Sequence, residues 1–210
     1  MPIRFDYDFA TEKQFSYEGL SVNASVKHLA KFASDIWQIH PFCEGNTRAT
    51  AVFMIKYMKT FGLVNNGAFE KNSWYFRNAL VRANYNNLQN GVHATTKFLE
   101  MFFSNLILDT NYDLKNRYMH VDYISEDSNN EMQSATENNP KGKICTLDCP
   151  LDELAILQLI MENPNITQKE IAIRIEKSER TVKNKVASLK EKGYIQRLNG
   201  KRSGKWVVLI

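Results

Sequence analysis

The sequence has few cysteines, no long apolar run and no large excess of charge of either sign. Three cysteines among 210 residues (Cys43, Cys145 and Cys149) are an odd and sparse set, which fits a reducing cytoplasm better than secretion. The longest apolar stretch, around residues 98–108, is broken by polar residues and falls short of the roughly 20 residues that span a bilayer. The N-terminus has no apolar run of signal-peptide type. Membrane channels and secreted disulfide scaffolds are therefore excluded.

What is present is a globular composition with an uneven distribution of charge. Hydrophobic residues make up 43% and charged residues 24%, which excludes wholesale disorder. Residues 151–210 carry 12 Lys and Arg against 7 Asp and Glu, whereas residues 1–150 carry 15 against 16. All of the net charge of +4 therefore comes from the last 60 residues. This division predicts two modules with different partners.

Helical spacing dominates the first half of the chain. Residues 1–20 hold aromatic and acidic side chains in an uneven pattern, and we expect extended or loop structure there. From Ser21 apolar residues recur every three or four positions as far as Ile39, and Pro41 ends the pattern. Further helices are expected near 51–61, 71–88 and 92–108. Residues 109–149 lose this periodicity and are rich in Asp, Asn, Ser and Glu, which predicts a polar linker.

The last 60 residues predict three helices and a two-stranded hairpin, which is the order of a winged helix-turn-helix. Thr167 and Glu170 form a capping box at the second helix, and Ser178 can cap the third. The third helix would turn Val182 and Val186 inward. We expect its other face and the wing to meet double-stranded DNA through Arg180, Thr181, Lys183, Asn184, Lys185, Lys201, Arg202 and Lys205. The alternative is a solvated charged face on a protein-binding winged helix, which Glu176, Glu179 and Glu191 favour by diluting the positive field.

A loop between the first two predicted helices gathers the chemistry. It reads His40-Pro-Phe-Cys-Glu-Gly-Asn-Thr-Arg48. Gly45 and the helix that begins near Asn46 can form an anion site, and Arg48 adds a charge suited to phosphate oxygens. Glu44 is a hard oxygen ligand for Mg²⁺, and His40 can take a proton from a hydroxyl. The set predicts attack of a hydroxyl on a metal-bound phosphate ester; the alternative is a structural corner in which Arg48 pairs with Glu44.

These nine residues resemble the signature of Fic domains, H-x-F-x-(D/E)-G-N-G-R-x-x-R, and the resemblance extends over about residues 5–108. It implies transfer of AMP from ATP to a Ser, Thr or Tyr hydroxyl of a target protein. His40 would be the general base, Phe42 a buried anchor and Glu44 the Mg²⁺ ligand. The phosphate cradle and the contact to the nucleotide base would come from Gly45, Asn46, Thr47, Arg48 and Asn84. Fic domains often dimerise, so a homodimer is a further candidate assembly.

The chain departs from the family pattern at two motif positions. Thr47 replaces the second glycine and resists positive φ, so we expect ordinary helical angles there. Ala51 replaces the final arginine, which in the family contacts the outer phosphate, and its absence bears on ATP preference and turnover. The family's inhibitory glutamate signature has no match. Only 39 residues precede His40, so a shortened N-terminus is expected, with residues 4–19 as the candidate for the target-aligning flap.

The sequence therefore predicts a mainly α protein, with a Fic-type helical bundle over 1–108, a polar linker over 109–149 and a small α+β winged helix-turn-helix over 150–210. The leading function is a cytoplasmic, bacterial-type protein adenylyltransferase that uses ATP and Mg²⁺. The alternatives are a catalytically degraded Fic scaffold that acts as a DNA-binding regulator, and a Fic enzyme with another nucleotide donor. A Cys43–His40 nucleophile is a minor rival reading, and Trp206 is expected in the core.

Overall fold

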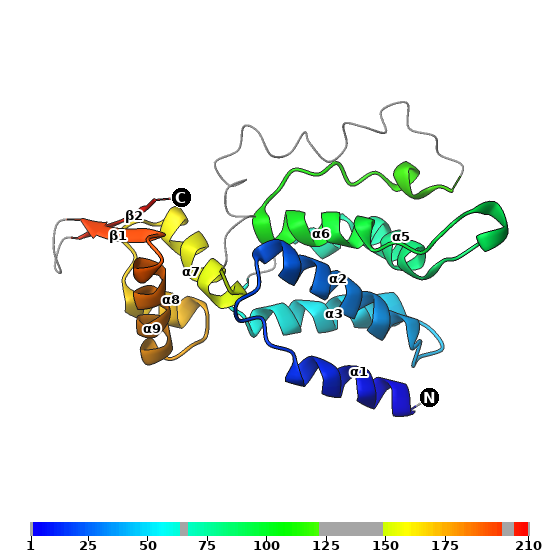
Figure 1. Ribbon diagram of the computed structural model, residues 1–210, viewed down its shortest axis with the longest axis horizontal. Helices are drawn as coiled ribbons and strands as arrows, with labels where there is room; N and C mark the ends of the chain where they lie inside the picture. Colours follow the sequence, from blue (N-terminus) through cyan, green and yellow to red (C-terminus); the bar gives the residue numbers. More distant parts are fainter. Residues whose placement is uncertain (1, 64–66, 122–148, 199–203, 210) are drawn as a thin grey trace.

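The computed structural model describes residues 2–63, 67–121, 149–198 and 204–209, and its helices fall into two groups. The larger group, shown on the right of Figure 1, is entirely helical; the smaller one, on the left, ends in a two-stranded sheet. The prediction of a mainly α protein with a small α+β part is confirmed. The larger group consists of α1 (Pro2–Gln14), α2 (Val22–Gln38), α3 (Asn46–Lys59), α4 (Ala68–Lys71), α5 (Ser73–Asn84), α6 (Lys97–Leu108) and the short 3-10 turns η1 (Leu88–Asn90) and η2 (Asn116–Met119).

Helix α2 is the centre of the larger group, because it contacts α1, α3, α5 and α6. The Ser21 hydroxyl accepts the backbone N–H of Ala24 at 3.3 Å and caps the helix, as the sequence indicated. The apolar stripe that predicted this helix is buried, with Leu29 fully covered. Opposite it, α4, α5 and α6 contribute a cluster of four phenylalanines with edge-on and tilted rings: Phe69, Phe76, Phe102 and Phe103.

Helix α1 is a correction, because residues 1–20 were expected to be extended and residues 4–19 to supply a flap. Residues 2–14 are helical instead. Pro2 suits the first helical position, where no N–H is needed. Phe9 packs edge-on against Phe32 of α2 and Phe53 of α3, with ring centroids 5.9 and 5.2 Å apart. The apolar pattern failed because a carboxylate, Glu12, shares the buried face of the helix.

The smaller group has the order of a winged helix: α7 (Leu151–Glu162), α8 (Gln168–Arg174), α9 (Glu179–Glu191), β1 (Ile195–Leu198) and β2 (Lys205–Val208). The strands pair antiparallel, with Ile195 opposite Val208. Thr167 and Glu170 form the predicted capping box, and Ser178 caps α9 by accepting the Thr181 N–H. Trp206 is buried and donates its indole N–H to the Ile166 carbonyl at 2.9 Å, so its predicted core position is confirmed.

Helix α7 joins the two groups, since it packs on both. It is apolar nearly all round, as expected for a helix buried on opposite faces. Toward the winged helix it contacts α9 and β2. Toward the larger group, Gln158 donates to the carbonyl of Ile107 at the end of α6 at 2.6 Å. The chain just after α3 comes so close that a β-carbon on Gly62 would lie 3.4 Å from the Cβ of Ala155 and 2.8 Å from that of Ile175.

Part of the predicted linker is attached to the helical group. The side chain of Asn105 binds the backbone at Tyr112, Asn78 bonds Asn116, and Met119 is buried. Residues 122–148, with Cys145, lie outside the described residues, as does the wing tip 199–203 with Lys201 and Arg202. Among the described helices, none has the length and apolar character needed to cross a membrane.

Candidate nucleotide-transfer loop and DNA interface

The motif loop runs from the end of α2 to the start of α3. His40 is exposed and adopts a left-handed backbone conformation, with φ of 46°. A non-glycine residue rarely takes this region, so its conformation marks a place where the chain turns sharply. The ring of Trp37 meets the imidazole edge-on, with centroids 4.5 Å apart. His40 is thereby presented to solvent at the edge of the loop, where a substrate hydroxyl could reach it.

Gly45 provides the second turn of the loop. Its φ of 80° is left-handed, which glycine tolerates and which the sequence reasoning required of this position. Helix α3 starts at Asn46, so the first backbone N–H groups of that helix have no carbonyl partners within it and lie at its positive end. The local chain is therefore built as an anion-binding turn.

Asn46 has a role that the sequence did not indicate. Its amide nitrogen donates to the Phe42 carbonyl at 2.7 Å, and its amide oxygen accepts the Phe42 N–H at 3.0 Å. These two bonds close the loop on itself. The side chain of Asn46 therefore holds the turn in shape, and what it can offer an anion is its backbone N–H.

Thr47 and Arg48 occupy the first turn of α3. Thr47 has ordinary helical geometry, as expected for a β-branched residue, and its hydroxyl accepts the indole N–H of Trp37 at 3.1 Å. This bond ties the end of α2 to the start of α3. Arg48 is exposed and folds back over the loop, because a β-carbon on Gly45 would lie 3.5 Å from its Nη2. A guanidinium so placed faces the anion turn.

Phe42 is a correction, since the family resemblance implied a buried anchor. Its side chain is 56% exposed. The space between the loop and α1 is an open groove of about 520 Å³ rather than packed core, and Phe42 lies at its edge. We call this the α1 groove. Its lining includes Phe9, Trp37, Ile39, Pro41, Phe42 and Phe53, together with His40, Asn46 and Asp6.

The metal prediction rests on Glu44 alone. Glu44 is exposed, and among the described residues no three His, Cys, Asp or Glu side chains gather as a metal site. Mg²⁺ commonly takes one or two carboxylates and completes its shell with water and substrate phosphates. One exposed carboxylate beside an anion turn fits that pattern. Cys43 is also exposed, and its sulfur has no bond to another cysteine.

Asn84 lies away from the loop in its hydrogen bonding. Its amide nitrogen donates to the Ser34 hydroxyl and to the Leu80 carbonyl, both at 2.9 Å. Ser34 precedes His40 by six residues, a rise of about 9 Å along a helix. These bonds attach Asn84 to the middle of α2, and the remaining amide oxygen is what it could present to a nucleotide base.

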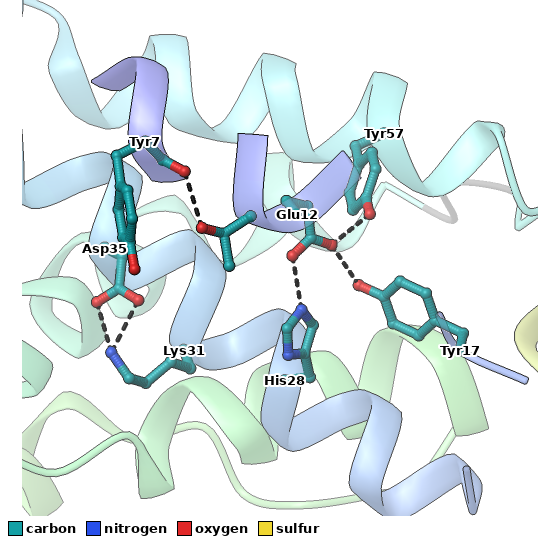
Figure 2. Close-up of polar contacts among 8 residues, drawn as sticks. Tyr7, Glu12, Tyr17, His28, Lys31, Asp35 and Tyr57 are labelled. Carbon is teal, nitrogen blue, oxygen red and sulfur yellow. Dashed lines mark hydrogen bonds and ion pairs between the residues drawn. The ribbon is translucent and has the colours of Figure 1, made fainter. Parts of the chain in front are cut away.

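A buried carboxylate anchors α1 beside the loop (Figure 2). Glu12 accepts hydrogen bonds from the hydroxyls of Tyr17, at 2.8 Å, and Tyr57, and its Oε2 lies 2.6 Å from His28 Nε2. Burial by itself would raise the pKa of Glu12, but the bonds from His28 and the two tyrosines outweigh it and lower the pKa from its usual 4.5. Phe15 stacks on the His28 ring at 3.5 Å. The sequence gave no signal of this network, because its members are far apart along the chain.

The predicted DNA face of α9 is present in the described residues. Val182, Val186 and Leu189 are buried, and Arg180, Lys183 and Asn184 are exposed on the other side. Thr181 is partly buried, with its hydroxyl 2.8 Å from that of Ser178. Lys185 differs from expectation, since it is partly buried and paired with Asp152 at 3.1 Å. Lys205 is exposed at the start of β2.

Comparisons with known proteins match both groups of helices. Residues 4–58, from α1 through the loop to α3, match the family model of the Fic/DOC family. Residues 153–196 match the model of winged helix-turn-helix DNA-binding domains. No curated protein and no solved structure matches the chain. The chain therefore carries a Fic/DOC family domain followed by a winged helix-turn-helix domain of the DNA-binding kind.

Proposed function

We propose that the chain is a nucleotidyltransferase of the Fic type, a protein adenylyltransferase, which is attached to DNA by its winged helix. The observation that carries this proposal is the motif loop. An exposed histidine, a left-handed glycine at a helix N-terminus and a guanidinium folded over that turn lie within nine residues. These are the parts that hydroxyl attack on a phosphate ester needs.

The proposed reaction follows from these positions. ATP would place its phosphates at the N-terminus of α3, held by backbone N–H groups and by Arg48. His40 would take the proton of the target hydroxyl, whose oxygen attacks the α-phosphorus. The bond from that phosphorus to the β-phosphate oxygen breaks, pyrophosphate leaves, and AMP remains on the protein. Mg²⁺, held by Glu44 and by phosphate oxygens, would neutralise charge on the leaving group.

The donor is tested with each of the four nucleoside triphosphates labelled at the α-phosphate. We expect label from ATP on protein in the wild type and its loss in His40→Ala. Label from a different nucleotide would keep the chemistry and change the donor. Equal label in both proteins would exclude catalysis by His40.

Ala51 supports a second candidate function, a Fic domain without turnover that acts within a DNA-binding regulator. Ala51 lies three residues after Arg48 on α3, and no second guanidinium stands there to meet an outer phosphate. Absence of label from every nucleotide, together with sequence-selective duplex binding, would favour this function. Binding should weaken as salt rises, because phosphate contacts release counterions.

For DNA binding we propose α9 as the recognition helix. Arg180 and Asn184 would read base edges, while Lys183 would meet phosphates, joined by Lys205 and by Lys201 and Arg202 of the wing. Arg180, Lys183 and Asn184 are exposed opposite the buried face of the helix. Lys185 is left out of this set, because Asp152 neutralises it.

A further inference from the structure

The α1 groove has no part in the transfer chemistry described above. Its lining is largely apolar, with Phe9 from α1, Trp37 from α2 and Phe53 from α3 among its walls. His40 lies on the same lining. At about 520 Å³ it falls within the size range of protein sites that bind organic ligands or anchor side chains. A hydroxyl in position to react with His40 would therefore bring whatever flanks it over this groove.

The groove is formed before anything binds, because α1 is fixed. Glu12, buried on α1, holds α2 through His28 and α3 through Tyr57 (Figure 2). Phe9 is wedged between Phe32 and Phe53, one residue from each helix. The wall contributed by α1 is therefore attached on two sides, and a ligand pays little to order it.

Recognition by strand pairing has no basis beside this loop. Residues 2–14 use their backbone groups in α1, and the strands of the described ranges lie in the winged helix. An acceptor that lies along the loop must then be recognised through its side chains. The chemistry of the groove selects apolar ones, and the carboxylate of Asp6, exposed on the groove lining, selects a cation near them.

We propose that the α1 groove binds the residues flanking the acceptor hydroxyl of the target protein, a segment with bulky apolar side chains next to the modified residue and a Lys or Arg within reach of Asp6. This inference rests on the proposed transfer function, whose acceptor it defines. It assigns substrate selection to Phe9, Phe53 and Asp6, which take no part in the transfer itself.

The test is selection from a displayed peptide library with a fixed central serine and randomised flanks. The bait is the full chain carrying His40→Ala, without nucleotide, so binding is read independently of catalysis. We expect enrichment of aromatic or large aliphatic residues beside the serine, and of Lys or Arg farther out. Asp6→Asn should remove the enrichment of cations and leave the apolar preference.

Two substitutions on α3 separate the groove from the rest of the surface. Ala49→Phe places a ring in the groove, since Ala49 lines it. Val52→Phe places the same ring on an exposed part of α3, where Val52 is 53% exposed and outside the lining. We expect Ala49→Phe to weaken binding of the enriched peptides at least tenfold and Val52→Phe to leave it unchanged. Circular dichroism and melting temperature verify that both fold.

Three outcomes would overturn the proposal. They are a library without flank preference, an unchanged preference in Ala49→Phe, and a concentration-dependent dimer that Ala49→Phe abolishes, which would assign the groove to a second copy of the chain. None of these changes the labelling result with ATP. Failure of the groove and failure of the transfer function are thus read in separate experiments.

Discussion

The motif loop and the winged helix respond differently to the same kind of sequence reasoning. In the winged helix, Thr167, Glu170 and Ser178 make the caps that their spacing indicated, and Trp206 is in the core. In the loop, His40, Gly45 and Arg48 lie together as expected, yet Phe42 faces outward. Helix caps and apolar stripes are determined within a few residues of sequence. The shape of the loop depends on α1, which is 26 or more residues away from Arg48 along the chain.

The sharpest way to break this comparison is His40→Ala. Loss of a general base typically costs between about 10² and 10⁴ in rate. We expect labelling with α-labelled ATP to fall by that factor while duplex binding, measured by fluorescence anisotropy, is unchanged. His93→Ala is the matched control, because His93 is also exposed and lies outside the loop. An equal loss in both variants would remove His40 from the reaction.

Gly62→Ala tests the junction between the regions. The new methyl group would lie 2.8 Å from the Ile175 Cβ at a φ of 80°, so both a clash and backbone strain are expected. Together they should cost about 3 kcal/mol of unfolding free energy. Gly19→Ala has nearly the same φ, 75°, and no atom within 4 Å, so it carries the strain alone, about 1 kcal/mol. Urea denaturation measures both, and similar losses would mean that Gly62 is not closely packed.

Glu12→Gln tests the anchor of α1. Removing one member of a buried charged network leaves its partners unsatisfied, and we expect about 2 kcal/mol of destabilisation at neutral pH. The pKa of Glu12 is lower in the folded chain than its usual 4.5. Its contribution to stability is therefore present above about pH 4.5 and is lost as the pH falls through the folded value.

The wild type should consequently lose more stability than Glu12→Gln between neutral and acid pH. Melting curves over that range measure the difference. Glu18→Gln, on an exposed carboxylate four residues beyond α1, should follow the wild type. Parallel pH profiles for the wild type and Glu12→Gln would contradict the anchor.

The smallest effect is expected at Lys183. Lys183→Ala should weaken binding to any duplex by about 1 kcal/mol and reduce the slope of log affinity against log salt by about 1. Lys27→Ala, on the exposed side of α2, should change neither. If both variants behave alike, the attraction comes from overall charge rather than from α9.

The residues that escaped prediction share a physical cause. Glu12 disrupts the apolar spacing of α1 because its partners, His28 and Tyr57, come from other helices. Lys185 looked free on its helical face, but Asp152 of α7 lies next to it in space. Trp37 has no motif role, and its bond to Thr47 exists only once α2 and α3 meet at the loop. Local patterns indicate elements, whereas these contacts depend on how the elements are assembled.

Helix α7 has a consequence for genetics. Because the same apolar cylinder packs against Gly62 on one side and α9 on the other, inherited changes at that seam should affect both activities at once. A screen for alleles that lose operator binding should recover substitutions at Gly62 and Ile107 as well as on α9. Alleles that lose only one activity should map to the loop or to the exposed side of α9.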